Sequence, residues 1–127
     1  MPECVLDASA FIALVNQEPG AEKVKPLLPQ AVIGAVNYCE TIQRLRRGGM
    51  PEEEVRLVLA PLVPTPVPFD EGLAYLAASV YDRTRAFGLS FGDCACLGLA
   101  LSRNMPAVTA EREWDKVDVG VKIIRIR

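Results

Sequence analysis

Four carboxylates in this 127-residue chain stand where apolar segments end or where helices begin. Asp7 directly follows the first apolar run, and Glu111 comes just after a later one. Glu40 and Asp93 each fall in the first turn of a predicted helix. In a parallel α/β sheet, the carboxyl ends of strands and the amino ends of helices share one edge, where ligands bind. We therefore expect these four acids to converge at that edge.

A gathering of carboxylates has a clear chemical use, which is to bind a divalent cation. Like charges held close together raise one another's pKa values, and a bound cation removes that repulsion. Oxygen-only ligands suit Mg²⁺ or Mn²⁺. Such an ion can activate water and neutralise the transition state of phosphodiester hydrolysis.

The chain contains no histidine. This excludes Ser-His-Asp and Cys-His catalysis, imidazole general bases and every metal site that needs a histidine ligand. The four cysteines include no CxxC pair, which disfavours a zinc site. Hydrolytic chemistry here would have to use the carboxylates.

The pattern of the rest of the chain predicts the elements that position these acids. Short apolar strands alternate with helices, which is typical of an α/β fold with a mainly parallel sheet covered on both faces. Strands are predicted at 3–6, 31–36, 106–109 and 121–126, and helices at 8–16, 21–28, 37–47, 51–60, 70–87, 90–104 and 111–115. Four prolines between positions 61 and 68 alternate with apolar residues, which favours an edge strand over a polyproline ligand.

Each acid also has a purely structural interpretation. Asp7 can cap the helix that follows it, and Asp93 fits a capping box. Glu40 can pair with Arg44, four residues later on the same helix. Glu111 can be a solvated charge at a helix start. Only the joint placement of the four favours a metal site.

Three arginines gather near the end of the predicted helix 37–47: Arg44, Arg46 and Arg47. They can neutralise the phosphates of an RNA backbone. Equally, they can be cations that the helix dipole favours at a carboxyl terminus. The sequence leaves both interpretations open.

Composition indicates one domain over residues 1–127, with enough apolar residues to build a core, since 50% are hydrophobic. The formal net charge of −2 excludes a strongly basic coat for nucleic acid but allows a local basic patch. No apolar run is long enough to span a membrane, and no signal peptide is recognisable. We therefore expect a cytoplasmic protein with reduced cysteines.

The four acids lie in motifs that resemble those of PIN-domain nucleases, most closely the VapC toxins of bacterial and archaeal toxin–antitoxin modules. The matching segments are V-L-D-A-S-A at 5–10, V-N-Y-C-E at 36–40, L-S-F-G-D-C-A-C-L-G-L-A at 89–100 and V-T-A-E-R-E-W at 108–114. They follow the family's order and span nearly the whole chain. The resemblance implies a three-layer α/β/α PIN-like fold.

The same resemblance implies the roles of individual residues. Asp7, Glu40 and Asp93 correspond to the metal-site carboxylates, and Ser9 and Thr109 to hydroxyl groups that support them. Both hydroxyls have an alternative role in hydrogen bonds to nearby backbone.

Position 111 departs from the family pattern, which usually has Asp there. Glu111 is the first candidate for the fourth carboxylate. Asp115, one helical turn later, is the second.

By resemblance, the chain is a metal-dependent endoribonuclease that uses Mg²⁺ or Mn²⁺ to hydrolyse RNA. It would be the toxin of a VapBC-type pair, inhibited by a cognate antitoxin protein and assembled as a homodimer. One alternative is a receiver-like phospho-acceptor domain, which would need an acidic pair after the first strand. Another is a PIN-like binding module whose catalytic site is weakened.

Overall fold

A single sheet of four parallel strands lies at the centre of the computed structural model, which describes residues 3–63 and 65–127. The strand order is β2-β1-β3-β4, and each neighbouring pair is parallel. The strands are β1 (Cys4–Leu6), β2 (Ala31–Val32), β3 (Ala107–Thr109) and β4 (Ile123–Arg125). The predicted α/β class with a mainly parallel sheet is confirmed.

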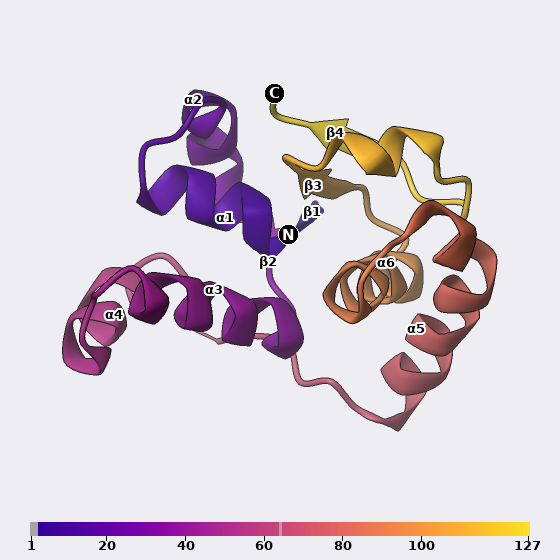
Figure 1. The fold of residues 1–127 in the computed structure, drawn as a ribbon, viewed down its shortest axis with the longest axis horizontal. Helices are drawn as coiled ribbons and strands as arrows, with labels where there is room; N and C mark the ends of the chain where they lie inside the picture. Colours follow the sequence, from indigo (N-terminus) through magenta and orange to yellow (C-terminus); the bar gives the residue numbers. More distant parts are fainter. Residues whose placement is uncertain (1–2, 64) are drawn as a thin grey trace.

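Helices cover both faces of this sheet (Figure 1). The α-helices are α1 (Ala8–Val15), α2 (Ala21–Val24), α3 (Ala35–Arg47), α4 (Glu52–Leu59), α5 (Glu71–Thr84) and α6 (Phe91–Arg103). The described residues also form three short 3₁₀ helices: η1 (Lys25–Gln30) between α2 and β2, η2 (Arg85–Phe87) between α5 and α6, and η3 (Arg112–Lys116) between β3 and β4. In Figure 1, α5 and α6 lie on one side of the strands, and α1 and α2 on the other.

The three layers follow from the alternation of side chains along the strands. Val5 and its partner Ala107 point to one face, where they pack with apolar residues of α5 and α6. Leu6 and its partner Val108 point to the opposite face and pack with residues of α1 and α2. Because helices cover both faces, β1 and β2 are apolar throughout, and β3 and β4 are apolar up to the polar residues that end them, Thr109 and Arg125.

The second strand is shorter than predicted. It ends at Val32, and α3 already begins at Ala35 rather than at Asn37. The run at 31–36 is apolar throughout, and such a run does not distinguish a buried strand from the first turn of a buried helix.

The edge strand predicted in the proline-rich segment is wrong. Among the described residues, this segment pairs through one isolated parallel bridge between Gly34 and Val67. Val67 N–H donates to the Ile33 carbonyl at 2.9 Å, but the flanking Pro66 and Pro68 have no N–H with which to extend the ladder. Pro64 lies outside the described residues.

Two predicted helices change character before they end. The helix expected at 21–28 is α2 followed by η1, in which Pro26 and Pro29 remove backbone donors. The helix expected at 70–87 is α5 followed by η2, and Gly88 ends it with a left-handed conformation at φ +77°. In the described part of the chain, no helix is long and apolar enough to cross a membrane.

Parallel pairing brings the carboxyl ends of all four strands to one edge of the sheet. Asp7 extends the ladder there, because its N–H donates to the Val108 carbonyl at 2.9 Å. Thr109, the last residue of β3, is next to Arg125 in the register of β4. The residues that follow β1 and β3 therefore lie side by side.

Candidate functional site

A pocket of about 300 Å³ lies at this edge, and all four predicted carboxylates line it. Asp7 comes from the end of β1, Glu40 from α3, Asp93 from α6 and Glu111 from the end of β3. The remaining lining residues are Arg44, Gly88, Leu89, Ser90, Glu113 and Trp114. Four elements far apart in the sequence thus bring their acids into one cavity.

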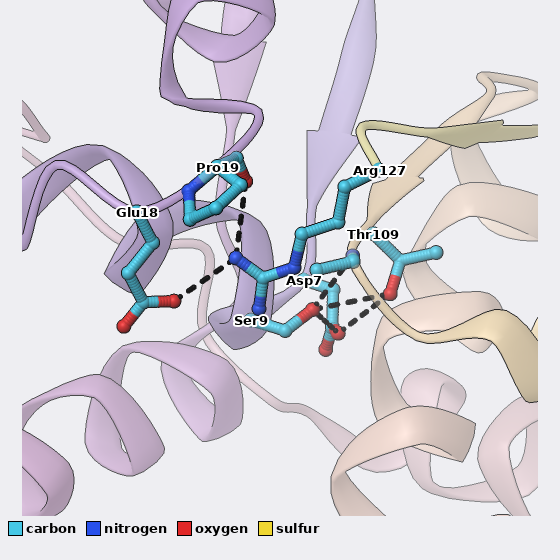
Figure 2. Close-up of polar contacts among 7 residues, drawn as sticks. Asp7, Ser9, Glu18, Pro19, Thr109 and Arg127 are labelled. Carbon is cyan, nitrogen blue, oxygen red and sulfur yellow. Dashed lines mark hydrogen bonds and ion pairs between the residues drawn. The ribbon is translucent and has the colours of Figure 1, made fainter.

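Asp7 is the most buried of the four, with 3% of its surface exposed. It occupies the N-cap position of α1, but its side chain makes no capping hydrogen bond. Instead, Oδ2 accepts hydrogen bonds from Ser9 Oγ at 2.7 Å and from Thr109 Oγ1 at 3.0 Å (Figure 2). The capping interpretation of this carboxylate therefore does not hold.

The two hydroxyls also join β3 to α1. Ser9 Oγ accepts from Ala110 N–H at 2.9 Å, and Thr109 Oγ1 accepts from Glu111 N–H at 3.0 Å. Each hydroxyl thus donates to Asp7 and accepts from the segment that carries Glu111. Ser9 and Thr109 are both buried, so their positions are fixed by packing as well.

Glu40 is positioned by a buried asparagine. Asn37 Nδ2 donates to Glu40 Oε1 at 2.9 Å and to the Gly92 carbonyl at 3.0 Å, and Asn37 is only 1% exposed. Gly92 has no side chain, and a Cβ there would overlap the Glu40 carboxylate. This contact places Glu40 of α3 against the start of α6, beside Asp93.

Asp93 forms the capping box that its sequence predicts. Its Oδ2 accepts from Ser90 N–H at 2.9 Å, and its own N–H donates to Ser90 Oγ at 3.2 Å. This structural role does not exclude another, because the side chain also lines the pocket.

The two candidates for the fourth carboxylate, Glu111 and Asp115, have different surroundings. Glu111 lines the pocket, whereas Asp115 is exposed and forms an ion pair with Arg125 on β4. Glu113 lines the pocket as well and adds a fifth carboxylate.

Three carboxylates of the pocket, Asp7, Glu40 and Glu111, have raised pKa values. Burial raises the pKa of Asp7 to about 7, the hydrogen bonds from Ser9 and Thr109 oppose this rise, and the charges of Asp93 and Glu40 add to it. Burial also raises the pKa of Glu40, and the Asp93 and Glu111 charges contribute after it. The pocket therefore carries an excess of negative charge.

The pKa of Glu111 is raised as well. Burial raises its pKa most, followed by the charges of Asp93 and Glu113, while Arg44 and Arg127 lower it. Arg127 itself is held by Glu18 at 3.1 Å and by the Pro19 carbonyl at 3.0 Å (Figure 2).

The three arginines of α3 have different surroundings. Arg44 lines the pocket, and its charge lowers the pKa of Glu40. No ion pair joins these two side chains among the described residues. Arg46 pairs with Glu52 at 3.6 Å, and Arg47 is exposed outside the pocket lining.

Three of the carboxylates are each held through one oxygen only. Asp7 Oδ2, Glu40 Oε1 and Asp93 Oδ2 accept the protein hydrogen bonds described above. Within residues 3–63 and 65–127, the second oxygen of each has no hydrogen-bond partner. One oxygen thus fixes the orientation of the side chain, and the other is left for a ligand.

No closed metal shell exists in this arrangement. In the described part of the chain, no three His, Cys, Asp or Glu side chains surround a common point at which a metal ion could sit. The donor types nevertheless suit a hard cation, because all are carboxylate oxygens and their mutual repulsion favours a positive ligand. A pocket of about 300 Å³ has room for an ion that keeps several of its waters.

Asn37, Gly92 and Glu113 were not predicted as site residues. Asn37 precedes Glu40 by three positions in a helix, a spacing that puts both on one face and could have indicated it. Gly92 acts through a contact between segments 52 residues apart, for which the sequence carries no local signal.

Gly92→Ala tests whether the Glu40 position matters. Alanine favours a helix over glycine by about 1 kcal/mol, and the group that it would displace is the flexible end of Glu40. We expect the fold to persist while Glu40 turns away, so that Mn²⁺ no longer raises the melting temperature measured by differential scanning fluorimetry. Gly72→Ala, in α5, is the matched control. An unchanged Mn²⁺ response in Gly92→Ala would contradict this role of Glu40.

The raised pKa of Asp7 predicts how stability depends on pH. An acid whose folded-state pKa exceeds its unfolded value stabilises the fold at low pH, and this contribution is lost as pH rises through that pKa. Between about pH 4 and pH 7, ionisation of Asp7 should therefore lower the free energy of unfolding of the metal-free protein. Each unit by which the folded-state pKa exceeds the unfolded one corresponds to about 1.4 kcal/mol. Asp7→Asn removes the charge and keeps a hydrogen-bond acceptor.

In EDTA, Asp7→Asn should be more stable than the parent chain at pH 8, by on the order of 2–4 kcal/mol, and this gain should vanish near pH 4. Urea unfolding at both pH values measures it. Asp115→Asn, at an exposed and paired carboxylate, should show no such gain. Loss of stability in Asp7→Asn at pH 8 would rule out a strained, buried charge.

The fold is shared with known toxin–antitoxin proteins. A chain of the DNA-bound VapBC from Salmonella typhimurium superposes with a TM-score of 0.77 at 19% sequence identity and covers 100% of both chains. VapBC-1 from nontypeable Haemophilus influenzae superposes with a TM-score of 0.71 at 22% identity, with 96% of each chain covered. VapBC-5 from Mycobacterium tuberculosis superposes with a TM-score of 0.63 at 23% identity, and the match covers 98% of this chain and 100% of that chain.

Among curated protein sequences, none matches this chain. The family model described as PIN domain matches residues 4–120, a range that contains all four carboxylates. This match confirms the resemblance drawn from the sequence motifs, and with it the three-layer α/β/α fold. The chain belongs to the PIN domain family.

Proposed function

We propose that this chain is a metal-dependent endoribonuclease of the VapC type. The observation that carries the proposal is the pocket at the carboxyl edge of the parallel sheet, where four acids from four elements leave oxygens without protein partners. The raised pKa values of Asp7, Glu40 and Glu111 support a cation as the missing partner. The receiver-like alternative has no support from the family match.

Mg²⁺ or Mn²⁺ is the proposed cofactor. Asp7, Glu40 and Asp93 hold the cation, directly or through water. When bound, the cation supplies a Lewis acid that activates a water and offsets the negative charge on the reacting phosphodiester. Glu111 holds a second cation or orients the attacking water.

The surrounding residues orient these carboxylates. Ser9 and Thr109 fix Asp7 Oδ2 and so direct Oδ1 away from them, while Asn37 does the same for Glu40. The capping box holds Asp93 at the first turn of α6. Such outer hydrogen bonds commonly change metal affinity or activity by about 10- to 100-fold when they are lost.

The proposed biological role is that of the toxin in a VapBC-type pair. The structural neighbours are chains of VapBC complexes, which supports a cognate antitoxin protein as the partner here. We further propose that the protein acts in the cytoplasm as a homodimer, with RNA as its substrate and residues 1–127 as one nuclease domain. A PIN-like module that only binds its antitoxin is the competing account, and RNA cleavage separates the two.

Asp7→Asn and Asp93→Asn should each abolish RNA cleavage while the chain stays folded. Both changes are nearly isosteric, and Asn at position 93 still accepts the hydrogen bond from Ser90. The assay is digestion of total RNA by purified protein with Mn²⁺, with the cut ends mapped by sequencing. The parent protein should also lose cleavage in EDTA and recover it when Mn²⁺ is added.

Circular dichroism and melting curves give the folding control, and Asp115→Asn gives the matched carboxylate control. Cleavage at the parent rate in either site variant, or cleavage that survives exhaustive EDTA treatment, would overturn the proposed metal site.

Glu111→Gln should lower Mn²⁺-dependent cleavage by about tenfold or more, because position 111 lines the pocket. Asp115→Asn should change it by less than about twofold, since this exposed side chain pairs with Arg125 instead. Glu111→Asp should retain activity or raise it, since one methylene fewer brings the carboxylate closer to the usual family position. Initial rates on one RNA substrate measure all three. A larger loss in Asp115→Asn at equal stability would show that the fourth carboxylate is assigned wrongly.

A further inference from the structure

The pocket contains one cation among its described lining residues, and that cation is Arg44. It lies on α3, four residues after Glu40, so the two side chains share a face of the helix. The other basic residues of this helix end, Arg46 and Arg47, do not line the pocket.

The Arg44 charge reaches acids from two separate elements. It lowers the pKa of Glu40, on its own helix, and that of Glu111, which follows β3. Arg44 therefore combines a place in the pocket lining with a charge that acts on acids from both elements.

Arg44 is nevertheless free to bind something else. Within residues 3–63 and 65–127, its side chain has no hydrogen bond or ion pair, and it is exposed. Arg46 and Arg56 both pair with Glu52, and Arg127 pairs with Glu18. Arg47 has no such partner among the described residues either, but it does not line the pocket, so the pocket position is what distinguishes Arg44. A planar guanidinium with five unused donors matches two oxygens of a phosphodiester.

We propose that Arg44 binds the non-bridging oxygens of the phosphodiester that occupies this pocket, through a forked pair of hydrogen bonds. The inference rests on the proposed nuclease function and names the group that positions the reacting phosphate. Arg44 sits beside the cation-binding carboxylates without contributing a ligand, so it can hold the phosphate while they hold the ion.

A different role for Arg44 would be to offset the charges of Glu40 and Glu111 only. In that case any cation suffices, and Arg44→Lys restores full function. If the fork matters, Arg44→Lys keeps the charge but loses the paired geometry, so it falls between the parent and Arg44→Gln.

The first experiment measures binding without turnover. A fluorescein-labelled oligouridylate of twelve nucleotides is titrated with full-length protein in Ca²⁺, and a gel checks that the RNA is intact afterwards. Arg44→Gln should weaken binding by about tenfold or more, as expected for a lost hydrogen bond to a charged group. Arg47→Gln is the matched control, with the same charge change one turn along α3, and should weaken it less than about threefold.

The second experiment uses bis(p-nitrophenyl) phosphate with Mn²⁺, a substrate with a single phosphodiester. Arg44→Gln should lower kcat/KM by about tenfold or more, Arg44→Lys by an intermediate factor, and Arg47→Gln by less than twofold. An arginine that contacts only a neighbouring phosphate of RNA would leave this small substrate unaffected.

Equal behaviour of Arg44→Gln and Arg47→Gln on the small diester would overturn the proposal, and so would full recovery in Arg44→Lys. If the parent protein cleaves neither substrate, the nuclease function fails, and the binding titration alone decides on Arg44. A selective loss in Arg44→Gln would then support the phosphodiester contact, and equal affinities would refute it.

Discussion

The burial of several carboxylates at one edge of the sheet, close enough to repel one another, is the constraint on which this site depends. The parallel sheet ends β1 and β3 at the same edge. The second turn of α3 adds Glu40 there, and the first turn of α6 adds Asp93. Burial makes the repulsion stronger, since charge inside a protein is screened less than charge in water. Burial is the main cause that raises the pKa of Asp7 to about 7, and the charges of Asp93 and Glu40 add to it.

The structure manages that repulsion without neutralising it. Ser9 and Thr109 donate to Asp7, Asn37 donates to Glu40, and a backbone N–H donates to Asp93. In each carboxylate, these hydrogen bonds go to one oxygen and leave the second without a partner among the described residues. A fold selected only for stability would be better served by removing the charges, because burying unpaired ions is costly. This cost supports the proposed cationic ligand.

Much of this site could be predicted from the sequence, because local patterns position its main residues. Asp7 and Glu111 follow apolar strands, and Asp93 stands in a capping box, all of which the sequence signals directly. The contact of Asn37 with Gly92 could not be predicted, since it depends on how α3 packs against α6. The same holds for Arg44, which only the packing distinguishes from Arg46 and Arg47. The prediction of an edge strand was wrong for a local reason: the prolines that flank Val67 have no backbone N–H to donate to a neighbouring strand.

The central claim is that the acids of this pocket bind a divalent cation, and anomalous diffraction from crystals grown with MnCl₂ tests it most directly. The account predicts an anomalous difference peak in the pocket, within coordination distance of Asp7, Glu40 or Asp93 or of waters bound to them. Crystals of Asp7→Asn should lack this peak. A fully occupied Mn²⁺ peak elsewhere on the molecule, with none among these carboxylates, would contradict the account.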